Sequence, residues 1–160
     1  AMTMGHRVAV LKDGLLQQVA APKELYHKPV NSFVAGFIGS PAMNLLKAER
    51  VNGALKLAGA SLTVNNELHK AMTDQKESDF TIGFRPEHLR LGGEGINGKV
   101  RIIEELGSEA YVHVDITHQG KDEKIIVRKN DDAGVERGEN VTIGLTRDIH
   151  LFGADGTRLE

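Results

Sequence analysis

Residues 80–88 have the sequence FTIGFRPEH, and this stretch indicates the fold of the chain. Phe80, Ile82 and Phe84 alternate with smaller or polar residues, which is the two-residue period of a β-strand. The strand is predicted to end or bend at Arg85, because a following proline disfavours the helical conformation. The Pro-Glu-His residues that follow are then expected at one end of a β-structure.

The same alternation recurs in residues 112–116 and 141–145, where valine, isoleucine or leucine occupies every second position. Turn-forming glycines lie between these segments, and glycine accounts for 18 of the 160 residues. Short strands at this spacing predict a mainly β fold, a small barrel of the OB type, over residues 41–160. Its inward-facing side chains are expected to be Ile82, Val112, Val114, Val141, Ile143 and Leu145.

Residues 1–40 have a mixed pattern and are predicted to form an α/β segment that precedes the barrel. The β-prone residues 7–11 and 15–20 flank an Asp-Gly turn dipeptide, which predicts a hairpin. Pro22 suits the first position of a short helix over residues 22–27, where its missing N–H has no cost.

A second short helix is predicted over residues 33–38, with Asn31 or Ser32 as its cap. This helix is expected to bury one apolar face against another part of the protein. The face consists of Phe33, Val34, Phe37 and Ile38.

The composition excludes several classes of function. The formal net charge is −2 with acidic and basic residues interspersed, and Tyr111 is the one obvious aromatic candidate for base stacking, so no nucleic-acid partner is expected. The chain has no cysteine, which excludes disulfides, thiolate metal sites and a cysteine nucleophile. Its apolar stretches are too short to span a bilayer.

Residues 93–99 match the glycine and lysine spacing of a phosphate-binding P-loop. The next residue is Val100 where a P-loop has serine or threonine for magnesium, and a β-prone run follows where a helix should begin. We therefore interpret this stretch as a glycine-rich hairpin turn.

No catalytic or metal-binding constellation is predicted. The seven histidines form no metal-ligand pair, and the serines have no nucleophile elbow. The adjacent acids Glu104 and Glu105 would face opposite sides of a strand, which disfavours a general acid–base pair. We therefore expect neither a cofactor nor an enzymatic activity in this chain.

Six segments resemble the ATP-binding subunits of maltose- and glycerol-3-phosphate-type sugar-import ABC transporters. The first three lie in the N-terminal segment and are the most specific, and the resemblance extends along essentially the whole chain. His6 stands where that family commonly has aspartate, just before a strand. The segments are residues 1–14, 22–29, 33–41, 83–88, 105–109 and 150–159.

The resemblance implies that residues 1–40 end an ABC ATPase domain and that residues 41–160 form a TOBE or MOP-like regulatory domain. The nucleotide-binding motifs would then lie upstream, so ATP and magnesium are expected as cofactors of the longer parent protein and not of this chain. The implied partners are a second copy of the subunit, the membrane subunits, reached through the ATPase domain, and a regulatory protein. The implied location is cytoplasmic, at the inner face of the membrane.

The resemblance also implies a surface for regulation or contact between subunits. The alternative for Arg85 to His88 is a structural corner held by side-chain hydrogen bonds. The residues of the implied surface are Arg85, Pro86, Glu87, His88, Leu106, Gly107 and Glu109.

Two further expectations remain open at this point. Related small barrels bind oxyanions such as molybdate, which gives an alternative function, although residues 96–99 lack the Ser-Ala-Arg-Asn type of loop found there. Without an ATPase domain, residues 1–40 must fold back, pair with a second copy or stay mobile. Pairing or swapping between two chains is the outcome we predict.

Overall fold

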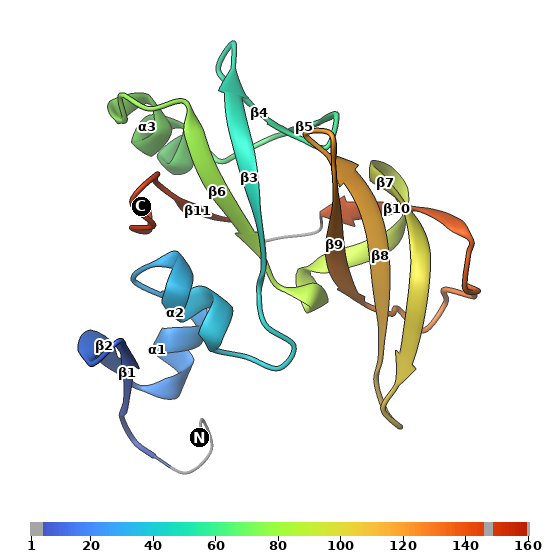
Figure 1. The fold of residues 1–160 in the computed structure, drawn as a ribbon, viewed down its shortest axis with the longest axis horizontal. Helices are drawn as coiled ribbons and strands as arrows, with labels where there is room; N and C mark the ends of the chain where they lie inside the picture. Colours follow the sequence, from blue (N-terminus) through green and yellow to red (C-terminus); the bar gives the residue numbers. More distant parts are fainter. Residues whose placement is uncertain (1–4, 146–148, 160) are drawn as a thin grey trace.

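The computed structural model describes residues 5–145 and 149–159, and it consists mainly of antiparallel strands (Figure 1). The helices are α1 (Pro22–His27), α2 (Ser32–Phe37), α3 (Asn66–Asp74) and the 3-10 turn η1 (Pro86–His88). The strands are β1 (Val8–Lys12), β2 (Leu15–Ala20), β3 (Asn44–Val51), β4 (Ala54–Leu57), β5 (Ala60–Leu62), β6 (Asp79–Phe84), β7 (Leu89–Glu105), β8 (Ala110–His118), β9 (Lys121–Arg128), β10 (Asn140–Leu145) and β11 (His150–Phe152). The predicted mainly β fold is confirmed.

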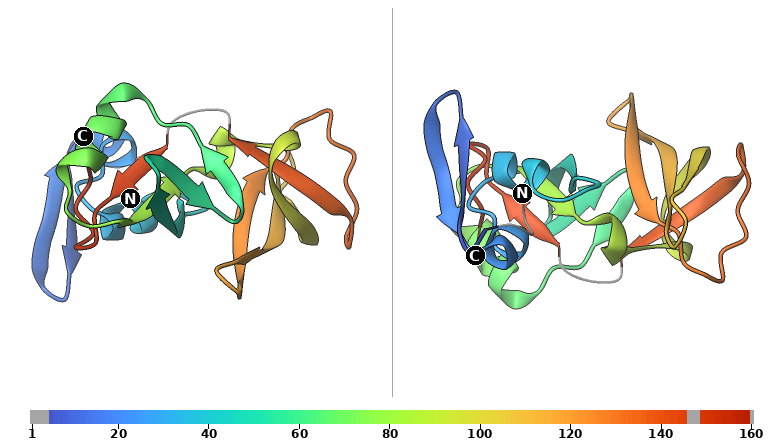
Figure 2. Two further views of the ribbon diagram at one scale, coloured as in Figure 1. Left: turned by 90° about the horizontal axis from the view of Figure 1, so that it is seen from above. Right: turned by 90° about the horizontal axis from the view of Figure 1, so that it is seen from below.

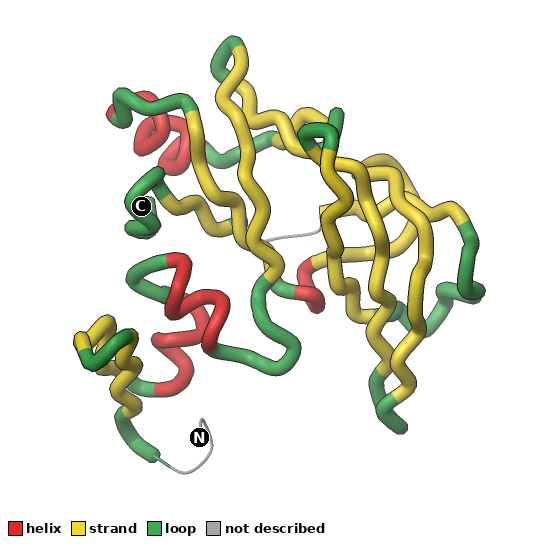
Figure 3. Tube along the Cα trace, in the orientation of Figure 1, coloured by secondary structure: helices red, strands yellow, loops and turns green. Residues whose placement is uncertain are grey.

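The strands after residue 41 form two antiparallel sheets that share one core. The first sheet has the order β11-β6-β3-β4-β5, and the second has the order β10-β7-β8-β9. Figure 2 shows the two sheets beside each other, with the β1–β2 hairpin at the end of the molecule remote from the second sheet. The tube in Figure 3 shows that α1, α2 and α3 lie on the side of the first sheet. Of the described helical elements, the 3-10 turn η1 lies against the second sheet, at β9.

The predicted inward positions lie in this shared core. Ile82, Val112, Val114 and Ile143 are fully buried, and Val141 and Leu145 pack against them while partly exposed. The partial exposure of the last two follows from their place on β10, which lies at an edge of its sheet.

The P-loop-like residues 93–99 lie inside the long strand β7, so the predicted hairpin turn is wrong. The register between β10 and β7 jumps from Asn97 to Leu91, and the residues between them loop out as a bulge. Gly95 is required there, because a Cβ atom would lie 1.9 Å from the carbonyl oxygen of Ile143. Strand, not helix, continues after the bulge, which removes the context of a phosphate-binding loop.

The N-terminal elements agree with the predicted hairpin and helices. Asn31 is the cap of α2, and its side chain accepts a hydrogen bond from the N–H of Val34 at 2.9 Å. The predicted buried face is wrong at Phe37, which is 65% exposed. A helix of only six residues buries a narrow stripe, here Val34 and Ala35, and Phe37 instead stacks on Phe33 with ring centroids 5.8 Å apart.

The described part of the N-terminal segment folds back onto the C-terminal part of the same chain around α2. The N–H of Ser32 donates to the carbonyl of Gly156 at 2.9 Å, and the N–H of Arg158 donates to the carbonyl of Val30 at 3.0 Å. Folding back therefore accounts for α1 and α2. Pairing between two chains stays a prediction, and its candidate is the β1–β2 hairpin, whose leucines are exposed.

Candidate functional site

The most elaborate polar site of the chain is built around Arg85, the residue between β6 and η1. Its side chain is 1% exposed, although arginine is among the residues that are seldom buried. Nη1 donates to the carbonyl oxygens of Ala35, at 3.3 Å, and of Ile38, and Nη2 donates to the carbonyl oxygen of Tyr26 at 3.0 Å. One side chain of the first sheet thus binds both N-terminal helices.

The acceptors explain why a charge is stable at this position. The carbonyls belong to the last turns of α1 and α2 and to the residue after α2, where helices leave carbonyl groups without intrahelical partners. The guanidinium also lies over the ring of Tyr26, with its central carbon 4.2 Å from the ring centroid. Burial lowers the pKa of Arg85 to about 10, so the side chain stays charged at neutral pH.

The loop after α2 is shaped to fit this arginine. Gly39 has a φ of 109° and lies so close that a Cβ atom there would be 2.9 Å from Nη1 of Arg85. A side chain at this position would push the loop away from the guanidinium. We call Arg85, Tyr26, Ala35, Ile38 and Gly39 the arginine junction.

Two buried polar side chains join the first sheet to the second. Asn44, at the start of β3, donates through Nδ2 to the carbonyl oxygens of Phe84 and Ile126 and accepts the N–H of Ile126. His118, at the end of β8, accepts the N–H of Ala58 at Nδ1 and donates through Nε2 to the carbonyl of Lys47. The hydrogen-bond partners therefore assign the neutral tautomer with the proton on Nε2.

The proposed surface residues fall into two places. Arg85 and Pro86 are buried within the chain, Glu87 is exposed and His88 is half-buried. Glu87 therefore faces solvent, whereas the side chain of Arg85 points toward α1 and α2.

Leu106, Gly107 and Glu109 lie at the turn between β7 and β8, and Leu106 is 55% exposed. Glu109 accepts a hydrogen bond from the hydroxyl of Tyr111 at 2.9 Å and forms an ion pair with Arg128.

Tyr111 relates these two places to each other. Burial raises the pKa of its hydroxyl, and the hydrogen bond to Glu109 and the negative charges of Glu109 and Glu87 raise it further. Both acids are thus within electrostatic range of one buried tyrosine.

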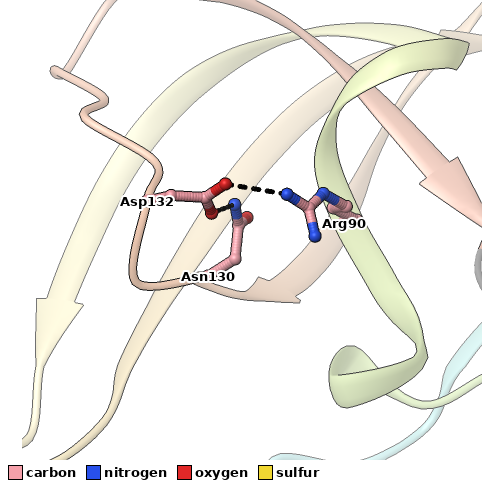
Figure 4. A network of polar contacts seen from close by, with 3 residues as sticks. All are labelled: Arg90, Asn130 and Asp132. Atoms are coloured by element: carbon pink, nitrogen blue, oxygen red, sulfur yellow. Dashed lines mark hydrogen bonds and ion pairs between the residues drawn. The ribbon is translucent and has the colours of Figure 1, made fainter.

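A second polar network lies on the surface of the four-stranded sheet (Figure 4). Arg90 Nη2 lies 2.8 Å from Asp132 Oδ2, and the side-chain amide of Asn130 donates to the same carboxylate. The hydrogen bond from Asn130 and the charge of Arg90 lower the pKa of Asp132. The side chains of Arg90 and Asp132 are exposed, so their ion pair stabilises the loop after β9 only weakly.

The described residues contain no cluster of three or more histidines or carboxylates arranged to hold a metal ion. Among the described helices, none has the length and apolarity needed to cross a membrane.

Two family models match the chain. The MalK OB fold domain matches residues 39–89, and the TOBE domain matches residues 82–152. They overlap in residues 82–89, the segment that contains Arg85. These matches favour the sugar-import interpretation and not the oxyanion-binding alternative.

Curated relatives extend the similarity over nearly the whole chain. The diacetylchitobiose uptake system ATP-binding protein MsiK of Streptomyces coelicolor is 39% identical over 99% of this chain and 47% of its own length. The maltose/maltodextrin import ATP-binding protein MalK is 39% identical in Vibrio cholerae, over 98% of this chain and 43% of the relative. The Escherichia coli K12 protein of that name is 36% identical, over 98% of this chain and 44% of the relative. The chain spans less than half the length of these relatives.

Proposed function

Because the chain belongs to the family of sugar-import ABC ATP-binding subunits, as their OB-fold and TOBE regulatory part, we propose that it regulates and dimerises the ATP-hydrolysing subunit of an importer for sugars or sugar phosphates. In this proposal the 160 residues hydrolyse nothing themselves. ATP and magnesium are bound by an ATPase domain of the longer parent protein. Contacts made at the surface of the regulatory part would change the activity of that ATPase domain.

The arginine junction is the observation that carries the proposal. It fixes the two helices of residues 1–40 to the residue that follows β6, and β6 lies inside the first sheet. Asn44 and His118 then fix the first sheet to the second. A displacement of the second sheet would therefore be passed to α1 and α2 through these hydrogen bonds. Connected hydrogen bonds of this kind are one physical means by which two sites can be coupled.

The β1–β2 hairpin supports contact with an ATPase domain. Leu11, Leu15 and Leu16 are 55%, 70% and 60% exposed, although burying one leucine is worth about 1.5–3 kcal/mol. We propose that the ATPase domain covers them, and that the membrane subunits are reached through that domain. The subunit would then act at the cytoplasmic face of the membrane.

The turn between β7 and β8 supports dimerisation or the docking of a regulatory protein. Leu106 in this turn is 55% exposed, and Ile102 near the end of β7 is 50% exposed; Glu104 and Glu109 are charged neighbours in the sequence. An apolar centre with a charged rim is typical of interfaces that form and separate.

The test uses the full-length subunit that contains this chain, reconstituted with its membrane subunits in vesicles. We expect Leu106→Asp to weaken subunit dimerisation in light scattering and to uncouple ATP hydrolysis from sugar uptake. Thr117→Asp, at an exposed position of β8 that is remote from this turn, is the matched control. Unchanged dimerisation and unchanged coupling in Leu106→Asp would count against the proposed contact surface. A reconstituted system that takes up no sugar would count against the proposed function as a whole.

A further inference from the structure

β5 is the last strand of the first sheet, and its outer edge lines a cavity. In the order β11-β6-β3-β4-β5, β5 pairs only with β4 among the described strands. The cavity has a volume of about 1040 Å³, and the six consecutive residues 60–65 all belong to its lining. Because six neighbours in the sequence contribute, the cavity runs along this edge as a groove. An uncovered sheet edge presents backbone N–H and C=O groups without partners.

The turn before β5 determines which backbone groups face this groove. β4 and β5 are joined by the two-residue loop 58–59, whose φ angles of 47° and 80° are those of a type I′ turn. In such a hairpin the residues that flank the loop, here Leu57 and Ala60, exchange hydrogen bonds, and the next pair along the strands does not. The N–H and C=O of Ser61 therefore point away from β4, toward the groove.

The edge continues beyond the end of β5. The exposure of residues 60–65 alternates with the two-residue period of a strand, and Asn65 has extended backbone angles, φ −68° and ψ 167°. Thr63 therefore presents its N–H and C=O to the same side as Ser61. Among the described residues, no backbone hydrogen bond beyond the β4–β5 pairing reaches either residue. Extended residues advance about 3.3 Å each, so the edge is roughly 20 Å long. The apolar residues of this segment pack half-buried against the core that the two sheets share: Ala60, Leu62 and Val64.

The second sheet supplies an apolar wall of the same groove. Ile96 in the bulge of β7 and Ile143 on β10 are buried, and Leu145 is half-buried. A bound strand uses both kinds of surface, since its edge forms hydrogen bonds and its faces carry side chains. The volume is at the upper end of the range of roughly 300–1,000 Å³ for small-molecule sites. The elongated lining therefore favours a peptide over a compact molecule.

Two carboxylates indicate the charge of the occupant. Glu67 lies in the first turn of α3, directly after the edge segment, and Glu94 lies in the bulge of β7. Neither forms an ion pair with a described residue. Of the permanent cations in the described lining, Arg85 and Arg158 already have partners within the chain, which leaves Lys28 against two carboxylates. A basic side chain in the groove would complement this charge.

We propose that this groove binds an extended, basic peptide segment of a partner protein, which pairs with residues 60–65 as a sixth strand of the first sheet. Hydrogen bonds to the backbone of Ser61 and Thr63 supply affinity, and apolar side chains at alternate positions of the peptide cover Leu62 and Val64. Basic side chains between them face the two carboxylates. This docking surface is separate from the turn between β7 and β8, and it does not depend on the function proposed above.

Fluorescence anisotropy with the 160-residue chain and a labelled heptapeptide tests the groove. The probe is fluorescein-Thr-Leu-Lys-Leu-Lys-Leu-Thr-amide, which has leucine at every second position and lysines between them. We expect saturable binding of one peptide per chain. Two further peptides keep these side chains but carry methyl groups on alternate backbone nitrogens, one on the even-numbered and one on the odd-numbered residues. Because successive N–H groups of a strand point to opposite edges, one of them should bind at least about tenfold more weakly and the other about as well as the probe.

Variants of the chain locate the bound peptide. Thr63→Pro removes the N–H that faces the groove and should weaken binding of the probe at least about tenfold, although proline is tolerated on an edge strand. Thr63→Val is its matched control, because it keeps the N–H and changes only an exposed side chain. Glu67→Gln combined with Glu94→Gln should weaken binding at least about threefold at low salt. Glu77→Gln, exposed and outside the cavity lining, should leave the affinity unchanged.

Four results would overturn the proposal: no saturable binding of the probe, equal binding of the two methylated peptides, equal affinities of Thr63→Pro and Thr63→Val, or binding unchanged by the loss of both carboxylates. Melting temperatures of all variants establish that they are folded. A chain that binds no probe, but forms dimers that Thr63→Pro abolishes in light scattering, would assign the edge to a second copy instead. Sugar uptake by the reconstituted full-length subunit is a separate measurement, so a groove that binds no peptide leaves the proposed function standing.

Discussion

The side-chain amide of Asn44 pairs with both backbone groups of Ile126, accepting its N–H at 2.8 Å and donating to its carbonyl at 2.9 Å. Ile126 belongs to β9, the edge strand of the second sheet, and Asn44 opens β3 of the first sheet. One side chain thereby supplies the two hydrogen bonds that a neighbouring strand would supply. It satisfies two backbone groups of the edge strand that would otherwise lack partners, and it links the two sheets.

Asn44→Leu is expected to destabilise the chain by about 2 kcal/mol, because two half-buried backbone groups of Ile126 lose their partners. Urea unfolding followed by circular dichroism gives the free energy of unfolding. Lys124→Leu, an exposed residue of the same strand β9, is the control and should change stability by less than about 0.5 kcal/mol. Equal stabilities of the two variants would show that the inter-sheet pairing contributes nothing.

The strands of this fold were predictable because their apolar residues alternate. Phe80, Ile82 and Phe84 are all buried, and the bend at Arg85 follows from Pro86 alone. Whether a segment forms a strand depends mainly on residues close together in the sequence, and the alternation of apolar and polar residues reveals it. The partition of the strands into two sheets depends on contacts between distant segments, such as Asn44 with Ile126, which no local pattern contains.

The polar residues of the site were harder to predict, although a signal existed. Asn44 shares its strand face with the buried residues Leu46 and Ala48, and His118 continues the buried series that ends at Ile116. A polar residue at an apolar position of an alternating strand indicates a buried hydrogen-bonding group. Its partners could not be predicted, because they are backbone atoms up to 82 residues away.

Arg85→Lys is expected to cost about 2 kcal/mol of stability, because one ammonium group cannot reproduce the planar contacts to three carbonyls and to the ring of Tyr26. The remaining carbonyls would be left unpaired in a buried place. Arg101→Lys is the matched control. Arg101 forms an exposed ion pair with Asp115, and such pairs are worth at most about 1 kcal/mol. Thermal unfolding of both variants compares them, and a smaller loss in Arg85→Lys than in Arg101→Lys would contradict the junction.

Stability is expected to fall above about pH 10, and Tyr111 should contribute to this fall. The pKa of Tyr111 is raised in the folded chain, so the folded state keeps the proton that the unfolded state has already released. The stabilising contribution is fully present below the unfolded pKa of about 10 and is lost as the pH rises through the folded pKa. In Tyr111→Phe the loss should be shallower, as measured by urea unfolding from pH 8 to 11. Arg85 titrates in both proteins, so only the difference between them reports Tyr111. Parallel pH profiles would argue against a perturbed tyrosine.

Gly95→Ala is expected to destabilise the chain by at least 3 kcal/mol, because the new Cβ would overlap the carbonyl of Ile143 at 1.9 Å and force β10 away from the bulge of β7. Gly134→Ala is the control, since nothing lies within 4 Å of a Cβ built there and its φ is not in the left-handed region. Chemical unfolding of the two variants separates a steric requirement from a general preference for glycine. A Gly95→Ala protein as stable as Gly134→Ala would place the bulge elsewhere in the strand.

The last prediction concerns the β1–β2 hairpin of the 160-residue chain in solution. Leu11, Leu15 and Leu16 are exposed on one short hairpin, and an exposed apolar group of this kind promotes association. Multi-angle light scattering should therefore detect concentration-dependent dimers of this chain. Leu15→Gln combined with Leu16→Gln should shift the equilibrium at least tenfold toward monomer while leaving the melting temperature within a few degrees, because neither side chain belongs to a buried cluster. The comparison variant combines Ile102→Gln on β7 with Leu106→Gln in the turn after it, the surface proposed to dimerise the full-length subunit, where the exposed fractions are 50% and 55%. If the hairpin mediates association, only the first pair of substitutions lowers the apparent mass. A dimer that persists in the first pair and is lost in the second would place the contact in the regulatory sheets, and a chain that is monomeric at every concentration would leave the hairpin with no self-association at all.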